Sequence, residues 1–169
     1  MIDYEALLTP LIAGGVEFIV IGGVAAIIQG SPLSTQDVDV VYRRSEENMR
    51  RLCIALEPFR PYLRGAPPGL PFRFDPPTVE RGLNFTLQTS LGPLDVLGEI
   101  VGGGGYDDLL PHSFEIESSG RRMRVLGLRR LIEVKRAAGR PKDLEAIAQL
   151  EVLLEERDAM PGGGGVDAS

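Results

Sequence analysis

Two aspartates, Asp37 and Asp39, stand two residues apart in an otherwise apolar run. In a strand over Asp37–Tyr42, side chains i and i+2 point to the same face, so both carboxylates project together. Val38 and Val40 then point to the opposite face. Two adjacent carboxylates repel each other and are costly to remove from water. A divalent cation offsets that repulsion, and hard oxygen ligands favour Mg²⁺ or Mn²⁺. The pair therefore predicts a metal site.

Asp95 is a third acid in an apolar segment, within the sequence GPLDVLGEI. On a strand beside Asp37–Tyr42, its carboxylate would lie about 5 Å from the first two, the usual cross-strand spacing. Three carboxylates can bind two divalent ions about 3.5–4 Å apart, one lowering the pKa of a nucleophile and one holding a leaving triphosphate. The alternative for Asp95 alone is a structural ion pair.

The elements before the aspartates could position a phosphate near them. Glu17–Ile21 reads as a short buried strand, and Gly22-Gly23 lets the backbone turn tightly and approach a ligand. A helix over Val24–Gln29 would then turn its first N–H groups toward the same side as the glycines. This arrangement predicts an anion site, reached before the loop Gly30–Gln36 leads into the aspartate strand.

The remaining chain alternates short strands with capped helices. Asp3 and Ser45 are suited to cap helices, the second of which runs to about Leu56. Pro58–Gly82 contains seven of the 13 prolines and predicts an extended surface excursion. The further expected elements are strands over Asn84–Thr89 and Leu94–Leu97, a flexible break at Gly102–Gly105, a hairpin of Phe114–Ile116 with Met123–Leu126, and a helix over Leu128–Ala138. A last helix is expected to reach about Arg157, with inward-facing Leu144, Ile147, Ala148 and Leu154.

Length and charge limit the function classes. The 169 residues predict one domain over 1–158, followed by a disordered glycine-rich tail over 159–169. The net charge of −6 argues against indiscriminate polyanion binding, yet half of the 18 Lys and Arg residues lie in Arg121–Lys142. That segment could hold a triphosphate or an RNA backbone, or it could be a solvated helix face.

The single cysteine, Cys53, excludes an internal disulfide and fits a reducing cytoplasm. No apolar run approaches the roughly 20 residues of a membrane span, and the acidic start is unlike a signal peptide, so no membrane association is expected. Dinucleotide-binding and P-loop glycine motifs are missing. His112 is the only histidine, which excludes a histidine-rich zinc site, and the single cysteine excludes a thiolate zinc site. A Cys–His dyad is disfavoured because Cys53 is expected in a helix core.

These residues together resemble a known superfamily. Gly22-Gly23, Ala26, Gly30, Thr35 and the Asp37-x-Asp39 pair, followed by Asp95, resemble the minimal nucleotidyltransferases of the DNA-polymerase-β-like superfamily. Within it, the chain looks most like bacterial nucleotidyltransferases of abortive-infection and toxin–antitoxin systems. The segment from Lys135 to Leu144, KRAAGRPKDL, resembles the ending of that group. The resemblance extends from about Glu17 to Leu154.

The resemblance implies an α/β (α+β) fold with a mixed β-sheet flanked by helices and a helical C-terminus. It implies Asp37, Asp39 and Asp95 as metal carboxylates for Mg²⁺ or Mn²⁺, with Asp95 helping to activate an acceptor hydroxyl. An NTP would lie against Gly22, Gly23 and the loop residues Ser31 and Thr35. Lys135 and Lys142 would reach its phosphates, and Asp143 would orient one of these lysines. The alternative for Asp143 is a structural acid in the first turn of the last helix.

Two function classes follow from this comparison. The first is an enzyme that moves a nucleoside monophosphate from an NTP to a hydroxyl of a protein side chain, a tRNA or a small molecule. The second is a catalytically weak nucleotidyltransferase-like binding module, the regulatory partner of another chain such as a toxin. Leu33 favours the second class, because related sequences often carry a basic residue at that position.

Overall fold

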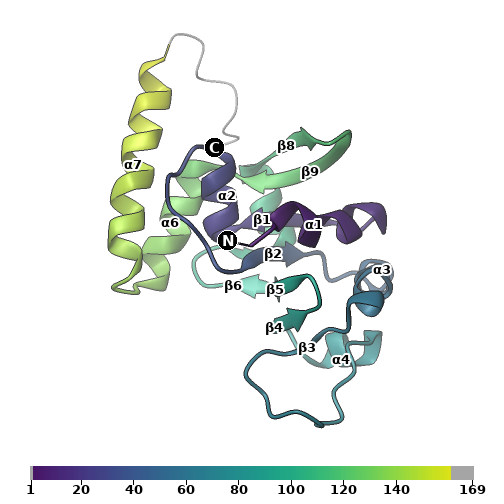
Figure 1. Ribbon diagram of the computed structural model, residues 1–169. Helices are drawn as coiled ribbons and strands as arrows, with labels where there is room; N and C mark the ends of the chain where they lie inside the picture. Colours follow the sequence, from purple (N-terminus) through teal and green to yellow (C-terminus); the bar gives the residue numbers. More distant parts are fainter. Residues whose placement is uncertain (1, 161–169) are drawn as a thin grey trace.

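The computed structural model describes residues 2–160, and within that range seven strands form one mixed sheet in the order β3-β4-β5-β2-β1-β9-β8 (Figure 1). The sheet strands are β1 (Phe18–Ile21), β2 (Val38–Tyr42), β3 (Tyr62–Leu63), β4 (Asn84–Thr89), β5 (Gly92–Leu97), β8 (Ser113–Ser118) and β9 (Arg121–Leu126). β2 is central, antiparallel to β1 and parallel to β5. The predicted mixed sheet with flanking helices is confirmed.

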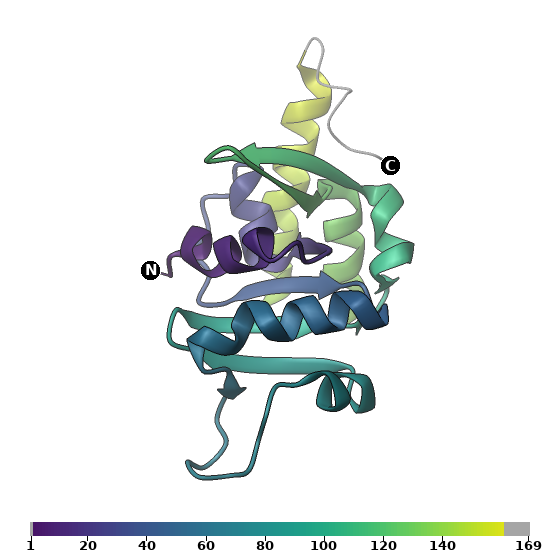
Figure 2. The same cartoon turned by 90° about the vertical axis from the view of Figure 1, so that its right-hand side faces the viewer.

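Helices lie on both faces of this sheet (Figures 1 and 2). They are α1 (Tyr4–Ala13), α2 (Gly22–Ile28), α3 (Glu46–Leu56), α4 (Pro76–Arg81), α5 (Tyr106–Leu109), α6 (Leu128–Ala138) and α7 (Asp143–Ala159), with 3₁₀ turns η1 (Glu57–Phe59) and η2 (Leu110–His112). Asp3 and Ser45 cap α1 and α3 as predicted, each accepting a hydrogen bond from a backbone N–H of the first turn. No helix within residues 2–160 is long and apolar enough to cross a membrane.

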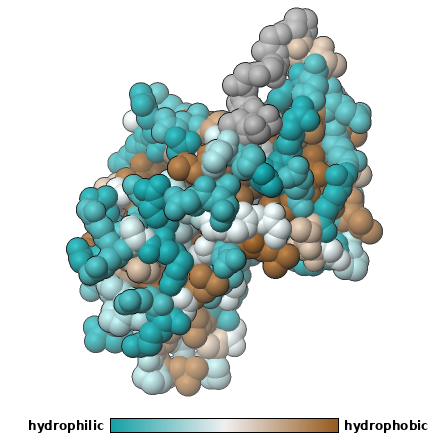
Figure 3. Space-filling view, turned by 180° about the vertical axis from the view of Figure 1, so that it is seen from behind, coloured by the Kyte–Doolittle hydropathy of each residue, from teal (hydrophilic) through white to brown (hydrophobic). Residues whose placement is uncertain are grey.

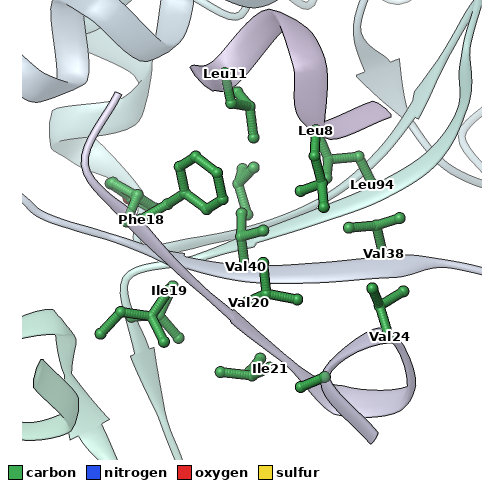
Figure 4. Packing of buried hydrophobic residues seen from close by; sticks show 14 of the residues in the cluster. Leu8, Leu11, Phe18, Ile19, Val20, Ile21, Val24, Val38, Val40 and Leu94 are labelled. Atoms are coloured by element: carbon green, nitrogen blue, oxygen red, sulfur yellow. The ribbon is translucent and has the colours of Figure 1, made fainter. Parts of the chain in front are cut away.

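The apolar side chains of β1 and β2 fill the core on both faces of the sheet. Leu8 and Leu11 of α1 lie on the same side as Val40 and Leu94, whereas Ile19 and Ile21 lie on the other side (Figure 4). All four residues of β1 are buried, as expected for a strand covered on both faces. Cys53 is also buried, on α3, as predicted.

Helix α7 stands at one side of the molecule and packs mainly on α6 (Figure 1). Ile147 and Leu154 pack against the core as predicted, but the prediction was wrong for Leu144, which is 69% exposed, and for Ala148. Asp143 explains the difference: its carboxylate is buried, and turning it inward places the next residue, Leu144, outward. Apolar residues are accordingly visible between hydrophilic ones along the α7 side of the molecule in Figure 3.

Two segments expected to be irregular contain regular structure. Pro58–Gly82 includes β3, which pairs with β4, and α4, with a protruding loop between them (Figure 2). Gly102–Gly105, expected to be a flexible break, includes β7 (Gly104–Gly105), which pairs with β6 (Glu99–Ile100). The predicted tail begins inside the last turn of α7, and its residues 161–169 lie outside the described range.

Candidate active site

The three predicted carboxylates lie together. Asp39 of β2 and Asp95 of β5 are register partners in a parallel strand pair, and Asp37 lies one residue before β2. Each of the three offers one carboxylate oxygen, and these oxygens all lie within 4.8 Å of one another. The sequence placed Asp37 inside the strand, whereas β2 begins at Val38. The cross-strand juxtaposition with Asp95 is confirmed.

The two glycines before these acids are required by the packing of the site itself. Gly22 has φ +65°, and a Cβ there would lie 2.3 Å from Oδ2 of Asp39. A Cβ on Gly23 would lie 2.7 Å from the side chain of Thr35. Helix α2 begins at Gly22 rather than at Val24, because both glycines belong to its first turn. The expected approach of the glycine backbone to a phosphate stays a prediction.

The loop between α2 and β2 is tied down by its own polar side chains. Thr35 donates a hydrogen bond from Oγ1 to the carbonyl of Asp37, at 3.1 Å. Ser31 is buried, and its hydroxyl accepts a hydrogen bond from the N–H of Leu33, at 3.2 Å. These bonds hold the loop over the acid triad, so Ser31 and Thr35 support the site's shape whether or not they contact a nucleotide.

Basic side chains from α6 and from the connection between α6 and α7 line the same cavity as the triad. Lys135 of α6 places Nζ 3.9 Å from Oδ1 of Asp143, and Arg140 donates from Nε to Oδ2 of the same carboxylate, at 2.7 Å. Asp143 is 4% exposed, so one buried acid lies beside both cations, and its role in orienting a phosphate-binding lysine stays a prediction. Lys142 is exposed and pairs with no acid among residues 2–160.

The acids and the cations enclose one open cavity of about 400 Å³. Its lining includes every residue predicted for the site: Gly22, Gly23, Ser31, Thr35, Asp37, Asp39, Asp95, Lys135 and Lys142. Leu33 and Arg140 line it as well. Such a volume lies within the range of small-molecule and cofactor sites. Segments more than 100 residues apart in the chain thus meet at one place.

The basic segment Arg121–Lys142 does not form one continuous patch. Most of its arginines pair with acids, several of which come from other elements: Arg124 with Glu115, Arg129 with Asp158, Arg130 with Glu133, Arg136 with Glu151, and Arg140 with Asp143. Of the nine basic residues, only Lys135, Arg140 and Lys142 line the cavity. The positive charge near the acids is therefore local and suited to a phosphate chain.

Sequence reasoning missed Arg64. This residue follows β3, and its guanidinium donates a charge-assisted hydrogen bond to Oδ1 of Asp95 and lies 3.5 Å from Oδ2 of Asp37. A further bond, from Nη2 to the carbonyl of Leu87 at 3.0 Å, anchors the side chain on β4. No local pattern singles out Arg64, because only the pairing of β3 with β4 brings it to the triad.

The electrostatics of the triad favour a bound cation. The pKa of the Asp39 carboxyl is raised to about 8, chiefly by burial and in addition by the charges of Asp37 and Asp95 and a hydrogen bond with Asp95. Lys135 opposes this shift. Burial and neighbouring negative charges keep this carboxyl protonated. A divalent ion bound beside it would stabilise the carboxylate form and so favour loss of the proton. Three clustered carboxylate oxygens fit a divalent metal ion.

No family model and no curated protein matches the sequence. Solved structures do match its fold. A candidate nucleotidyltransferase from Thermotoga maritima is similar at 16% identity and TM-score 0.50, over 92% of this chain and 96% of that one. The chain has a nucleotidyltransferase-like fold.

Two further structures agree. The lincosamide antibiotic adenylyltransferase LnuA, solved with lincomycin bound, is similar at 14% identity and TM-score 0.58, over 89% of this chain and 95% of that one. An antigenic nucleotidyltransferase-like protein from Paracoccidioides brasiliensis is similar at 16% identity and TM-score 0.55, over 95% of this chain and 76% of that one. At these identities the likeness concerns the fold, and the resemblance to toxin–antitoxin proteins is not among these findings.

Proposed function

We propose that this chain is a metal-dependent nucleotidyltransferase that moves a nucleoside monophosphate from an NTP to an acceptor hydroxyl. The observation that carries the proposal is the cluster of Asp37, Asp39 and Asp95, whose carboxylate oxygens lie within 4.8 Å of one another, in a cavity that also contains Lys135 and Lys142. Carboxylates for a divalent ion and cations for a phosphate chain are the two parts that phosphoryl transfer requires.

Each set of residues has a role in this reaction. Asp37, Asp39 and Asp95 would hold Mg²⁺ or Mn²⁺, which when bound neutralises phosphate charge and lowers the pKa of the attacking hydroxyl. Lys135 and Lys142 bind the β- and γ-phosphates and stabilise the pyrophosphate as it leaves. The acceptor oxygen forms a bond to the α-phosphorus while the bond from that phosphorus to the pyrophosphate oxygen breaks. Asp95 accepts the proton of the acceptor.

The acceptor is proposed to lie over β4, on the side of Asp95 away from the lysines. Thr86 of β4 is the register partner of Asp95, so their side chains share one face of the sheet. Asn84, Thr86 and Gln88 are exposed on that face, whereas Phe85 is buried. A polar surface of this kind suits a hydroxyl-bearing acceptor. The lincomycin-bound adenylyltransferase makes a small molecule the first acceptor class to test, ahead of a tRNA end or a protein side chain.

The test is transfer of label from an α-labelled NTP, with Mg²⁺ or Mn²⁺, into fractionated cell extract. Wild type, the double variant Asp37→Asn/Asp39→Asn, and Asp158→Asn as a matched control on α7 are compared. Label that enters one fraction with wild type and the control, but not with the double variant, supports the enzyme and names its acceptor class.

The alternative is the binding module with weak catalysis, in which the partner is another chain such as a toxin. Leu33 is the feature that favours it, since this apolar side chain lines the cavity where a basic residue is usual among the sequences that the chain resembles. The same assay separates the two. Absence of label, with metal–NTP still raising the melting temperature of wild type, supports the alternative. Absence of both label and shift contradicts every nucleotide function.

A further inference from the structure

The guanidinium of Arg64 lies between two of the three clustered carboxylates, where a metal ion would be expected. Its guanidinium bridges Asp95 and Asp37, contacting one oxygen of each, and no contact joins it to Asp39 among the described residues. A guanidinium is always charged and presents its donors in a planar fork, so it can satisfy two carboxylates at once. In this arrangement one organic cation compensates two of the three acids.

The position of Arg64 depends on a weak structural element. Arg64 follows β3, a two-residue strand at the edge of the sheet, and its own N–H bonds to the carbonyl of Thr86 at 3.0 Å. Gly65 comes next with φ +80°, and a Cβ there would meet nothing within 4 Å. The side chain is 31% exposed, so water can solvate the guanidinium if it leaves the acids.

The contact also leaves one polar atom unpaired. Nε of Arg64 is buried and has no hydrogen-bond partner among residues 2–160. A buried donor without an acceptor is unfavourable, and such groups are rare in folded proteins. The bridged arrangement of Arg64 therefore carries a penalty that is relieved when the side chain moves to solvent.

We propose that Arg64 is a built-in counter-ion that occupies one cation position of the triad, between Asp37 and Asp95, and that it leaves this position when a divalent ion enters. This inference rests on the proposed function, since it assumes that the triad binds metal. Arg64 is a positioning residue in this scheme: it keeps the acids in place in the metal-free protein and sets a threshold of metal–NTP concentration for filling the site.

The test is Mn²⁺ binding to chelator-stripped protein, followed through the electron paramagnetic resonance signal of free Mn²⁺. Arg64→Gln removes the competing charge and keeps a polar side chain, so its Mn²⁺ affinity should exceed that of wild type by about tenfold or more, because charge-assisted hydrogen bonds must break in wild type only. Arg51→Gln, which removes an exposed arginine paired with Glu47 on α3, is the matched control and should bind as wild type does.

Thermal unfolding gives a second readout. In chelator, Arg64→Gln should melt below wild type because Asp37 and Asp95 lose their counter-ion, and Mn²⁺ should raise its melting temperature by more than that of wild type. If Arg64→Gln does not fold, Arg64→Lys keeps the charge but presents a single ammonium in place of the fork. Arg64→Lys should then bind Mn²⁺ more tightly than wild type, though by less than tenfold.

Failure of this inference and failure of the proposed function give different results. Mn²⁺ affinity of Arg64→Gln and Arg64→Lys equal to or weaker than that of wild type overturns the counter-ion role, while leaving a metal site in place. Binding of Mn²⁺ to wild type that is no stronger than binding to Asp37→Asn/Asp39→Asn overturns both the metal site and the role of Arg64.

Discussion

The proton on Asp39 should make the stability of the metal-free protein depend on pH. Burial, together with the nearby charges of Asp37 and Asp95, raises the pKa of the Asp39 carboxyl from 3.8 to about 8. In the unfolded chain the carboxyl ionises near its ordinary value. Between about pH 4 and about pH 8 the folded protein therefore holds a proton that the unfolded chain has lost. Because the folded state binds more protons, its stability is highest at the acidic end of this window and falls as the pH rises.

The size of the effect follows from the shift. Each pH unit within the window changes the free energy of unfolding by about 1.36 kcal/mol, so from about pH 5 to about pH 8 the Asp39 carboxyl removes about 4 kcal/mol. The Asp39→Asn variant has nearly the same shape, cannot ionise, and can donate to Asp95 from its amide. Relative to wild type, it should therefore become about 4 kcal/mol more stable between the two pH values.

Urea unfolding in the presence of chelator, followed by circular dichroism at several pH values, measures this difference. All other titrating groups are shared by the two proteins, so they cancel in the comparison to first order. Asp158→Asn, at an exposed ion pair with Arg129, is the control and should follow wild type. Free energies of unfolding that change in parallel for wild type and Asp39→Asn, within about 1 kcal/mol over the window, would refute the reasoning about the triad.

Three further predictions concern the cavity and α7. Gly22→Ala should cost at least about 1–2 kcal/mol, because φ there is +65° and the new Cβ would lie 2.3 Å from Oδ2 of Asp39. It should also weaken Mn²⁺ binding, and a variant with unchanged urea midpoint and Mn²⁺ affinity would contradict the packing argument. Lys135→Ala should weaken NTP affinity in a thermal-shift titration more than it lowers stability, and unchanged affinity would move the phosphate site away from α6. Leu150→Ala should lower the free energy of unfolding by about 2–5 kcal/mol, because this side chain is only 1% exposed. Leu144→Ala should lower it by less than about 0.5 kcal/mol, because this side chain is 69% exposed. Equal losses in urea unfolding would contradict the observed inward and outward faces of α7.

The sequence by itself determined the local elements and most of the candidate site. Period-two and helical patterns and the caps Asp3 and Ser45 are short-range signals, and the structure confirms the elements that they predict. The spacing of Asp37 and Asp39 is also a local signal, because the geometry of extended backbone is enough to point side chains two residues apart to the same face.

Tertiary structure decided what depends on contacts between distant segments. The register that places Asp95 beside Asp39 arises from the parallel pairing of β2 with β5, two strands that are far apart in the sequence. The same holds for Arg64, which reaches the triad only because an edge strand pairs with β4. A buried carboxylate at Asp143 also sets which residues of α7 face inward, against the hydrophobic pattern that predicted Leu144.

For the charged residues, the sequence shows which are present, and the tertiary structure decides which of them pair. The sequence contains nine basic residues in Arg121–Lys142, but the acidic partners of Arg124, Arg129 and Arg136 lie on other elements, so only the folded chain shows that these charges are neutralised. Electrostatic energies depend on separation and burial, two quantities that a linear sequence does not contain. Residue types therefore predicted the chemistry of the site, and long-range packing determined which cations face its acids.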